Sequence, residues 1–270
     1  MRALPRGVEL VALNALPASV RDALYARLVP PELLARFQVD PRTFTNPWGE
    51  RVVRVTVGDG RPWARVELRA RADDPDPVLL VDVVMAPFDV PELALVQVND
   101  PAAPRFGIDR DDEGRDTALG TVRRNLREEA RALAAGLAPG QVRRGLRMLG
   151  RVLERMDAFC RLLGRELYLV EPLFYHSALL YERHGCDYLV GRDRMEAIHA
   201  GFAPGGPYWA RLDGSSPFRA RGFEATIRGR SWAIHDGVLG EPFSGPRHGV
   251  KMYRVPGRPA GVSTFPGARF

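Results

Sequence analysis

The stretch of residues 141–191 constrains the fold of this chain more than any other part. Residues 143–163 place apolar side chains on one broad arc of a helix, at about 100° per residue, with arginines on the other side. Gly164 stands where a glycine ends a helix, and residues 167–170 are apolar on both faces, as in a strand covered on both sides. A short helix and a short strand follow, up to Gly191. The pattern predicts a helix, a buried central or parallel strand, a second helix and a final strand.

The predicted long helix begins with a concentration of positive charge. Arg143, Arg144 and Arg147 lie in its first turns, where the positive end of the helix dipole disfavours a cation by a few tenths to about 1 kcal/mol. A bound anion removes this conflict, because free backbone N–H groups and guanidinium groups together bind phosphate or pyrophosphate. The alternative is that these arginines are solvated residues on the surface of an arginine-rich chain.

The end of the second predicted helix carries a recognisable motif. It follows the pattern A-x-L-Y-E-R-x-G, carried by Ala178, Leu180, Tyr181, Glu182, Arg183 and Gly185. With the basic turn, the amphipathic helix and the buried strand before it, the stretch of residues 141–191 resembles the second half of the GNAT N-acetyltransferase superfamily. The resemblance implies an α/β (α+β) fold with a mixed, mostly antiparallel central sheet flanked by helices.

The resemblance also implies a cofactor and a place for it. In that family an R/Q-x-x-G-x-G/A loop opens the helix, and its amides hold the pyrophosphate of acetyl-coenzyme A. The chain departs from this pattern, because Arg147 and Leu149 stand where glycines belong if Arg144 is the first position. In the register from Arg147 to Gly150, Val152 occupies the last small position. The residues expected to bind acetyl-CoA or another acyl-CoA are Gln141, Arg143, Arg144, Gly145, Arg147 and Gly150.

The reaction that the resemblance implies is the transfer of an acetyl or acyl group from coenzyme A to an amine. In this reading Tyr181 protonates the departing thiolate, and Glu171 or His176, just past the predicted buried strand, accepts the proton of the amine. The alternative is a non-catalytic GNAT-like binding or interaction protein with an anion-binding basic helix terminus. A metal-dependent enzyme is a lesser alternative, and no metal is predicted because the histidines and acidic residues show no ligand spacing.

Composition favours a globular protein without a membrane partner. The chain has 270 residues, 45% of them hydrophobic, with no signal-peptide pattern and no long apolar span, so we expect a cytoplasmic protein. A net charge of +6 raises the alternative of a nucleic-acid partner. Lys251 is the only lysine, however, and a chain-wide preference for arginine raises the charge without specifying a partner. We expect a small-molecule or protein amine as the partner, and Cys160 and Cys186 as reduced core residues.

Residues 1–100 are predicted to form helices followed by antiparallel strands of the main sheet. After an extended entry at residues 1–16, the apolar spacing of residues 17–37 predicts two short helices separated at Pro30-Pro31. Alternating apolar and polar residues then predict a strand hairpin and two further strands, at 51–57, 63–70, 78–85 and 93–98.

The remaining segments flank the GNAT-like stretch. Residues 101–140 are predicted to be a helical insertion, with a helix over residues 118–137. Residues 192–270 are rich in glycine and proline and predict a loop-rich C-terminal extension packed on the same domain. Residues 250–255 predict a strand that completes the sheet, and the tail over residues 257–270, which lacks periodicity, is expected to be mobile.

One further constellation in the C-terminal extension has a catalytic alternative. Ser231, His235 and Asp236 are residue types that act as nucleophile, base and orienting acid, and Ser231 and His235 meet at i,i+4 if the segment is helical. An aspartate adjacent to the histidine in sequence points away from it, however, which argues against this triad.

Overall fold

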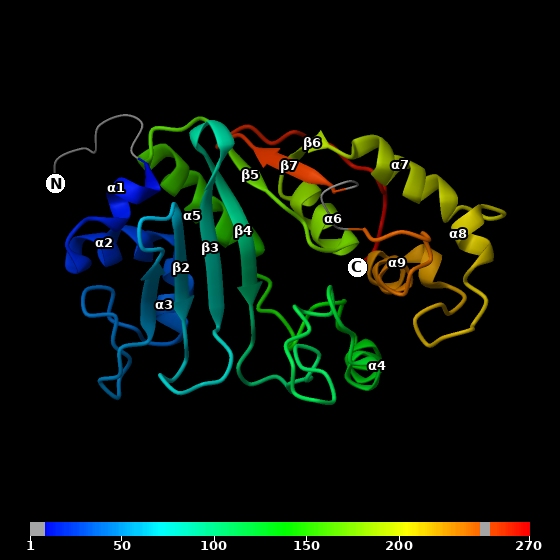
Figure 1. Ribbon diagram of the computed structural model, residues 1–270, viewed down its shortest axis with the longest axis horizontal. Coiled ribbons are helices and arrows are strands. Elements are labelled where there is room, and N and C mark those ends of the chain that lie inside the picture. Colours follow the sequence, from blue (N-terminus) through cyan, green and yellow to red (C-terminus); the bar gives the residue numbers. More distant parts are fainter. Residues whose placement is uncertain (1–8, 244–248) are drawn as a thin grey trace. The chain divides into compact units, whose positions relative to one another are not determined.

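The structure is a computed structural model, and it describes residues 9–243 and 249–270 (Figure 1). The chain forms two compact units, each assembled from segments that are far apart in the sequence. Unit 1 comprises Met1–Ala102, Gly145–Glu171 and Tyr253–Pro259, and unit 2 comprises Ala103–Arg144, Pro172–Met252 and Ala260–Phe270. The predicted range 141–191 is therefore divided between the units, after Arg144 and again after Glu171.

Seven strands of the described residues form one sheet in the order β1-β2-β3-β4-β5-β7-β6. The first four make an antiparallel meander, namely β1 (Val53–Val57), β2 (Trp63–Leu68), β3 (Leu79–Ala86) and β4 (Val90–Val98). The others are β5 (Tyr168–Val170), which is parallel to β4, β6 (Asp187–Val190) and β7 (Lys251–Arg254). The predicted mixed, mostly antiparallel sheet with flanking helices is confirmed, and so is the late strand that completes it.

The strands follow the burial that their sequences predict. In β2, buried residues alternate with partly exposed ones, as in a strand with one covered face. In β3, the near-continuous apolar run of residues 79–83 is buried on both faces.

In the helices of unit 1, the apolar residues that recur at helical spacing in the sequence are buried. Helix α5 (Leu149–Leu162) packs against β4, and its buried arc includes Val152, Met156 and Phe159. The predicted break at Pro30-Pro31 is confirmed. An extended entry is wrong for residues 10–14, which form a helix because Leu10 and Leu13 share one buried face. The N-terminal elements are α1 (Leu10–Asn14), α2 (Ala18–Tyr25), η1 (Ala26–Leu28) and α3 (Pro31–Arg36).

A buried ion pair fixes α5 to the end of the chain's last strand within unit 1. Asp157 accepts hydrogen bonds from Nε and Nη2 of Arg254 at 2.8 and 2.9 Å. The hydroxyl of Tyr168 on β5 donates to the same carboxylate at 3.0 Å. A carboxylate with three donors at this distance has its desolvation largely offset by charge-assisted hydrogen bonds.

The predicted start of the long helix is wrong. Helix α5 begins at Leu149, and Arg143, Arg144 and Arg147 lie in the irregular connection before it. The backbone of Arg147 has φ 57°, in the left-handed region that interrupts a helix. Within unit 2, the carbonyl of Val142 accepts the N–H of Phe106, and Nη1 of Arg143 donates to the carbonyl of Ala103 at 2.5 Å. These bonds hold the segment in the insertion, so it is not available as the first turn of α5.

Unit 2 combines the insertion with most of the C-terminal extension. A core cluster forms around Trp232 in helix α9, whose indole N–H donates to the carbonyl of Leu137 at 2.8 Å. The cluster also contains Phe106, Ile108, Ala132, Val142 and Phe218. The helices are α4 (Leu126–Ala134), α6 (Tyr175–Arg183), α7 (Arg192–Gly201), α8 (Pro207–Ala210), η3 (Phe223–Ala225) and α9 (Ile227–His235).

Two predictions for unit 2 need correction. The helix expected over residues 118–137 is only α4, because Ala118 and Leu119 have positive φ and Asn125 caps the helix by accepting the N–H of Glu128. The tail is packed although it lacks periodicity, since Thr264 is buried and donates to the buried carboxylate of Glu182 through both its N–H and its hydroxyl.

Candidate functional site

In unit 1, the C-terminal half of β4 has an open edge. Among the described residues, its pairing with β5 consists of Glu92 with Leu169 and Leu93 with Val170. β5 ends at this point, at Val170 (Figure 1). Residues 94–98 are all partly exposed, although β4 is the central strand of the sheet.

The backbone of β4 turns polar groups toward this edge. The N–H of Asn99 donates to the carbonyl of Val78 on the β3 side at 2.8 Å. Because N–H and C=O groups alternate in direction along a strand, those of Val96 and Val98 point to the opposite side. The chain returns beside them, since a Cβ added to Gly145 lies 3.0 Å from the carbonyl oxygen of Val98. A glycine allows this approach of two backbones.

Helix α5 begins after the returning segment, still within unit 1. Its N-cap residue, Met148, makes no side-chain capping bond, and its first turn contains no acidic residue. The first N–H groups of a helix lack partners within the helix. Of the residues predicted to bind the cofactor, Gly145, Arg147 and Gly150 lie in this part of unit 1.

The other predicted cofactor residues lie in unit 2. Arg144 is exposed, and Arg143 is bonded to the insertion as described above. The side-chain oxygen of Gln141 accepts the N–H of Ala138 at 2.8 Å, which closes the turn before it. The structure therefore does not bring all six residues together in one helical turn.

The predicted catalytic residues differ in environment and in unit. Glu171 is exposed in unit 1, directly after the last β5 residue that pairs with β4. His176 and Tyr181 are buried in α6 of unit 2, at 6% and 5% exposure. Burial raises the pKa of the Tyr181 phenol above its ordinary value of 10.0, so the phenol keeps its proton.

Unit 2 contains a pocket of about 440 Å³ that the sequence did not predict. Its polar lining includes Arg124, Ser231 and His235. The apolar lining residues are Val122, Leu173, Phe174, Ile234, Pro242 and Phe243. Such a cavity has the size and lining typical of small-molecule sites.

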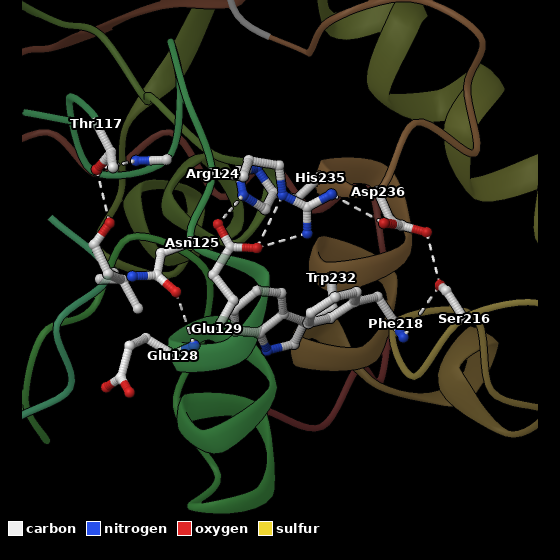
Figure 2. A network of polar contacts seen from close by, with 12 residues as sticks. Thr117, Arg124, Asn125, Glu128, Glu129, Ser216, Phe218, Trp232, His235 and Asp236 are labelled. Atoms are coloured by element: carbon white, nitrogen blue, oxygen red, sulfur yellow. Dashed lines mark hydrogen bonds and ion pairs between the residues drawn. The ribbon is translucent and has the colours of Figure 1, made fainter. Parts of the chain in front are cut away.

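A network of charged side chains supports one wall of this pocket (Figure 2). His235 Nε2 lies 3.1 Å from Oε1 of Glu129, which is 1% exposed. The other oxygen of Glu129 accepts from Nε and Nη2 of Arg124 at 2.8 and 2.5 Å. Arg124 also donates to Asp236 at 2.8 Å, and Asp236 accepts from the hydroxyl of Ser216 at 2.7 Å. The carboxylate of Glu129 is thus held between a guanidinium group and an imidazole.

The triad considered from sequence is not formed. Ser231 Oγ lies 2.9 Å from Nδ1 of His176, whereas His235 pairs with Glu129 and Asp236 with Arg124. Burial, helped by the nearby His235 and Arg228, lowers the pKa of His176 from 6.5 to about 3. His176 is therefore a neutral imidazole at neutral pH.

Sequence reasoning missed Glu129 and Arg124 as parts of a site. Both lie in a charged stretch that reads as a solvated helix surface, and the partner His235 is 106 positions away. The only local signal is the glycine at position 120. The backbone of Gly120 has φ 87° and passes close to the Glu129–His235 pair. A Cβ added to Gly120 would lie 2.9 Å from Glu129 and 3.1 Å from His235, so only glycine fits there.

The part of the chain that the structure describes has no group of three or more histidine, cysteine, aspartate or glutamate residues placed to hold a metal ion. Over the same ranges, no helix is long and apolar enough to cross a membrane. No protein-family model matches the sequence, and no curated protein or solved structure is significantly similar to it.

Proposed function

We propose that unit 1 binds acetyl-CoA or another acyl-CoA along the open edge of β4 and that the protein transfers the acyl group to an amine. The observation that supports this proposal is the unpaired half of β4. An interrupted strand pairing in the centre of a sheet leaves backbone donors and acceptors that a ligand can satisfy.

The chemistry of coenzyme A fits this edge. Its pantetheine arm is extended and contains two amide groups, which can pair with a strand edge as another strand would. The N–H and C=O groups of Val96 and the N–H of Val98 offer complementary partners on the side away from β3. The carbonyl of Val98 faces Gly145. The arm would then lie along the edge as a short additional strand.

The pyrophosphate of the same molecule requires positive partners. The uncapped first turn of α5 offers backbone N–H groups and the positive end of the helix dipole. Arg147, exposed and directly before this turn, supplies a guanidinium group within the same unit. These groups fit an anion, although Leu149 replaces one of the glycines that the family pattern contains.

Acyl transfer to an amine needs a proton acceptor and a proton donor. Glu171, exposed where β5 leaves β4, is suited to accept the proton of the attacking amine directly or through water. Tyr181, the proton donor expected from the sequence, is buried in unit 2 and keeps its proton, so the departing thiolate takes its proton from water. An amine attacks a thioester directly, so no protein nucleophile is needed.

Calorimetry with acetyl-CoA tests the binding step. Replacing Val96 by proline removes its N–H, while Val96→Ala keeps it and serves as the matched control. Loss of one amide hydrogen bond, worth about 0.5–1.5 kcal/mol, should weaken binding about two- to twelve-fold in the proline variant alone. Equal affinity of the two variants, or no binding to the unmodified protein, contradicts the proposal.

The second candidate is a GNAT-like protein that binds the coenzyme or another anion without catalysis. It is favoured by Arg147 and Leu149, whose side chains replace the glycines of the family loop. Thiol release from acetyl-CoA in the presence of an amine panel separates the two candidates. Binding with no amine-dependent thiol release, unchanged by Glu171→Gln, supports the non-catalytic protein.

A further inference from the structure

We propose that the pocket of unit 2 is a second functional site, in which His235 acts as a general base that removes a proton from a small organic molecule. The pocket of about 440 Å³ lies within the range of roughly 300–1,000 Å³ that is usual for sites of small organic molecules. The lining combines apolar side chains with polar ones, and the polar groups determine how a molecule is oriented; they belong to Thr121, Arg124, Tyr175, Ser231, His235 and Glu241.

The partner of His235 determines which ring nitrogen carries the hydrogen. Glu129 is paired with Arg124, and an ionised carboxylate accepts hydrogen bonds but donates none. The hydrogen between Oε1 of Glu129 and Nε2 of His235 therefore belongs to the imidazole. In a neutral imidazole with its hydrogen on Nε2, the other nitrogen, Nδ1, carries a free lone pair.

That nitrogen is available to a ligand. Among the residues that the structure describes, His235 makes a single side-chain hydrogen bond, to Glu129. The His235 side chain is 10% exposed and lines the pocket. A base that is mostly shielded from water but reaches a pocket is suited to proton transfer.

The surroundings hold His235 in this orientation. Arg124 donates two hydrogen bonds to Glu129, through Nε and Nη2, and one to Asp236, through Nη1. Trp232 and Phe174 contact the imidazole edge to face, with ring centroids 5.9 and 5.6 Å away. Such support fixes a catalytic side chain before a substrate arrives. When His235 gains a proton, the Glu129 carboxylate stabilises the resulting imidazolium.

The same pocket is poorly built for a serine nucleophile. Ser231 lines the pocket and contacts His176, which is the base that would have to take its proton. His176 is buried, and the nearby guanidinium of Arg228 opposes a positive charge on it. A proton on His176 is therefore costly, and the observations favour proton transfer at His235 over covalent catalysis at Ser231.

The proposed step is a balanced proton transfer. A C–H, O–H or N–H bond of the bound molecule breaks, its proton forms a bond to Nδ1 of His235, and its electron pair moves into the molecule or toward a leaving group. The proton then returns to the product or to water, which restores the neutral imidazole.

A chromogenic elimination tests this step without knowledge of the natural ligand. The probe is 5-nitrobenzisoxazole, in which a base takes the proton on the ring carbon next to nitrogen. The electron pair of that C–H bond then forms the nitrile, and the N–O bond breaks to release the coloured 2-cyano-4-nitrophenolate. The full-length protein should show saturable release of the phenolate. His235→Gln should lower the rate at least about tenfold, since a positioned general base contributes roughly 10²–10⁴-fold.

Two further variants and one spectrum complete the test. His184→Gln, an exposed histidine of the same unit, is the matched control and should leave the rate unchanged. Glu129→Gln should lower the rate because it no longer fixes the hydrogen on Nε2. A nitrogen NMR spectrum of labelled histidine should show Nε2 of His235 protonated at neutral pH. The proposal is overturned if the rate does not saturate, if His235→Gln equals His184→Gln, or if Nδ1 carries the hydrogen.

Discussion

Lowering the pH should destabilise unit 2 through His176. This imidazole is buried, and its pKa in the folded protein is about 3, against an ordinary value of 6.5. Between these values the unfolded chain binds a proton that the folded chain does not, so the free energy of unfolding falls as the pH falls. The contribution of His176 is fully present above about pH 6.5 and is lost progressively down to about pH 3.

The magnitude follows from the gap between the two pKa values. At 1.36 kcal/mol per pKa unit, the gap between 6.5 and about 3 corresponds to about 5 kcal/mol in total. At about pH 4.5, about 3 kcal/mol of this should already be lost, at a slope of about 1.4 kcal/mol per pH unit. This is a large part of the roughly 5–15 kcal/mol by which a typical domain is stable.

Urea unfolding followed by tryptophan fluorescence, repeated from about pH 7.5 to 4.5, measures this effect. Carboxylates also titrate in this window, so the relevant quantity is the difference in free energy of unfolding between the unmodified protein and His176→Asn. The asparagine can still bond to Ser231 but does not take up a proton. The difference should change by about 3 kcal/mol across the window. A difference that stays constant within about 0.5 kcal/mol refutes the argument.

Two further predictions concern the framework of each unit. In unit 1, Asp157→Asn removes the buried carboxylate that pairs with Arg254. The free energy of unfolding in urea should fall by about 3–5 kcal/mol. A fall below about 1 kcal/mol contradicts the role of the ion pair. In unit 2, Trp232→Phe removes the hydrogen bond to Leu137 and leaves a cavity in the core cluster. The free energy of unfolding should fall by about 2–4 kcal/mol. An unchanged free energy of unfolding means that the insertion and the C-terminal extension fold independently.

The sheet could be predicted from sequence because its signals are local. Alternation in β2 and the continuous apolar run of β3 identify strands without knowledge of their partners. The apolar faces of residues 167–170 predicted a central or parallel strand, and β5 is parallel to β4.

The start of α5 could not be predicted in the same way. The apolar spacing continues upstream of Leu149, but Val142 and Arg143 are bonded to Phe106 and Ala103 of the insertion. Long-range hydrogen bonds overrode the local helical pattern there. The pocket was also hidden, because Glu129 and His235 come from distant segments and Glu129 sits among arginines that suggest a solvated surface.

The function proposed for unit 1 depends on the open edge of β4, and amide hydrogen exchange tests it most directly. With saturating acetyl-CoA, exchange should slow at the N–H groups of Val96 and Val98, which point away from β3. The N–H groups of Leu95 and Gln97, which alternate toward β3, should change little. Unchanged exchange at Val96 and Val98 under saturation contradicts the proposed binding mode.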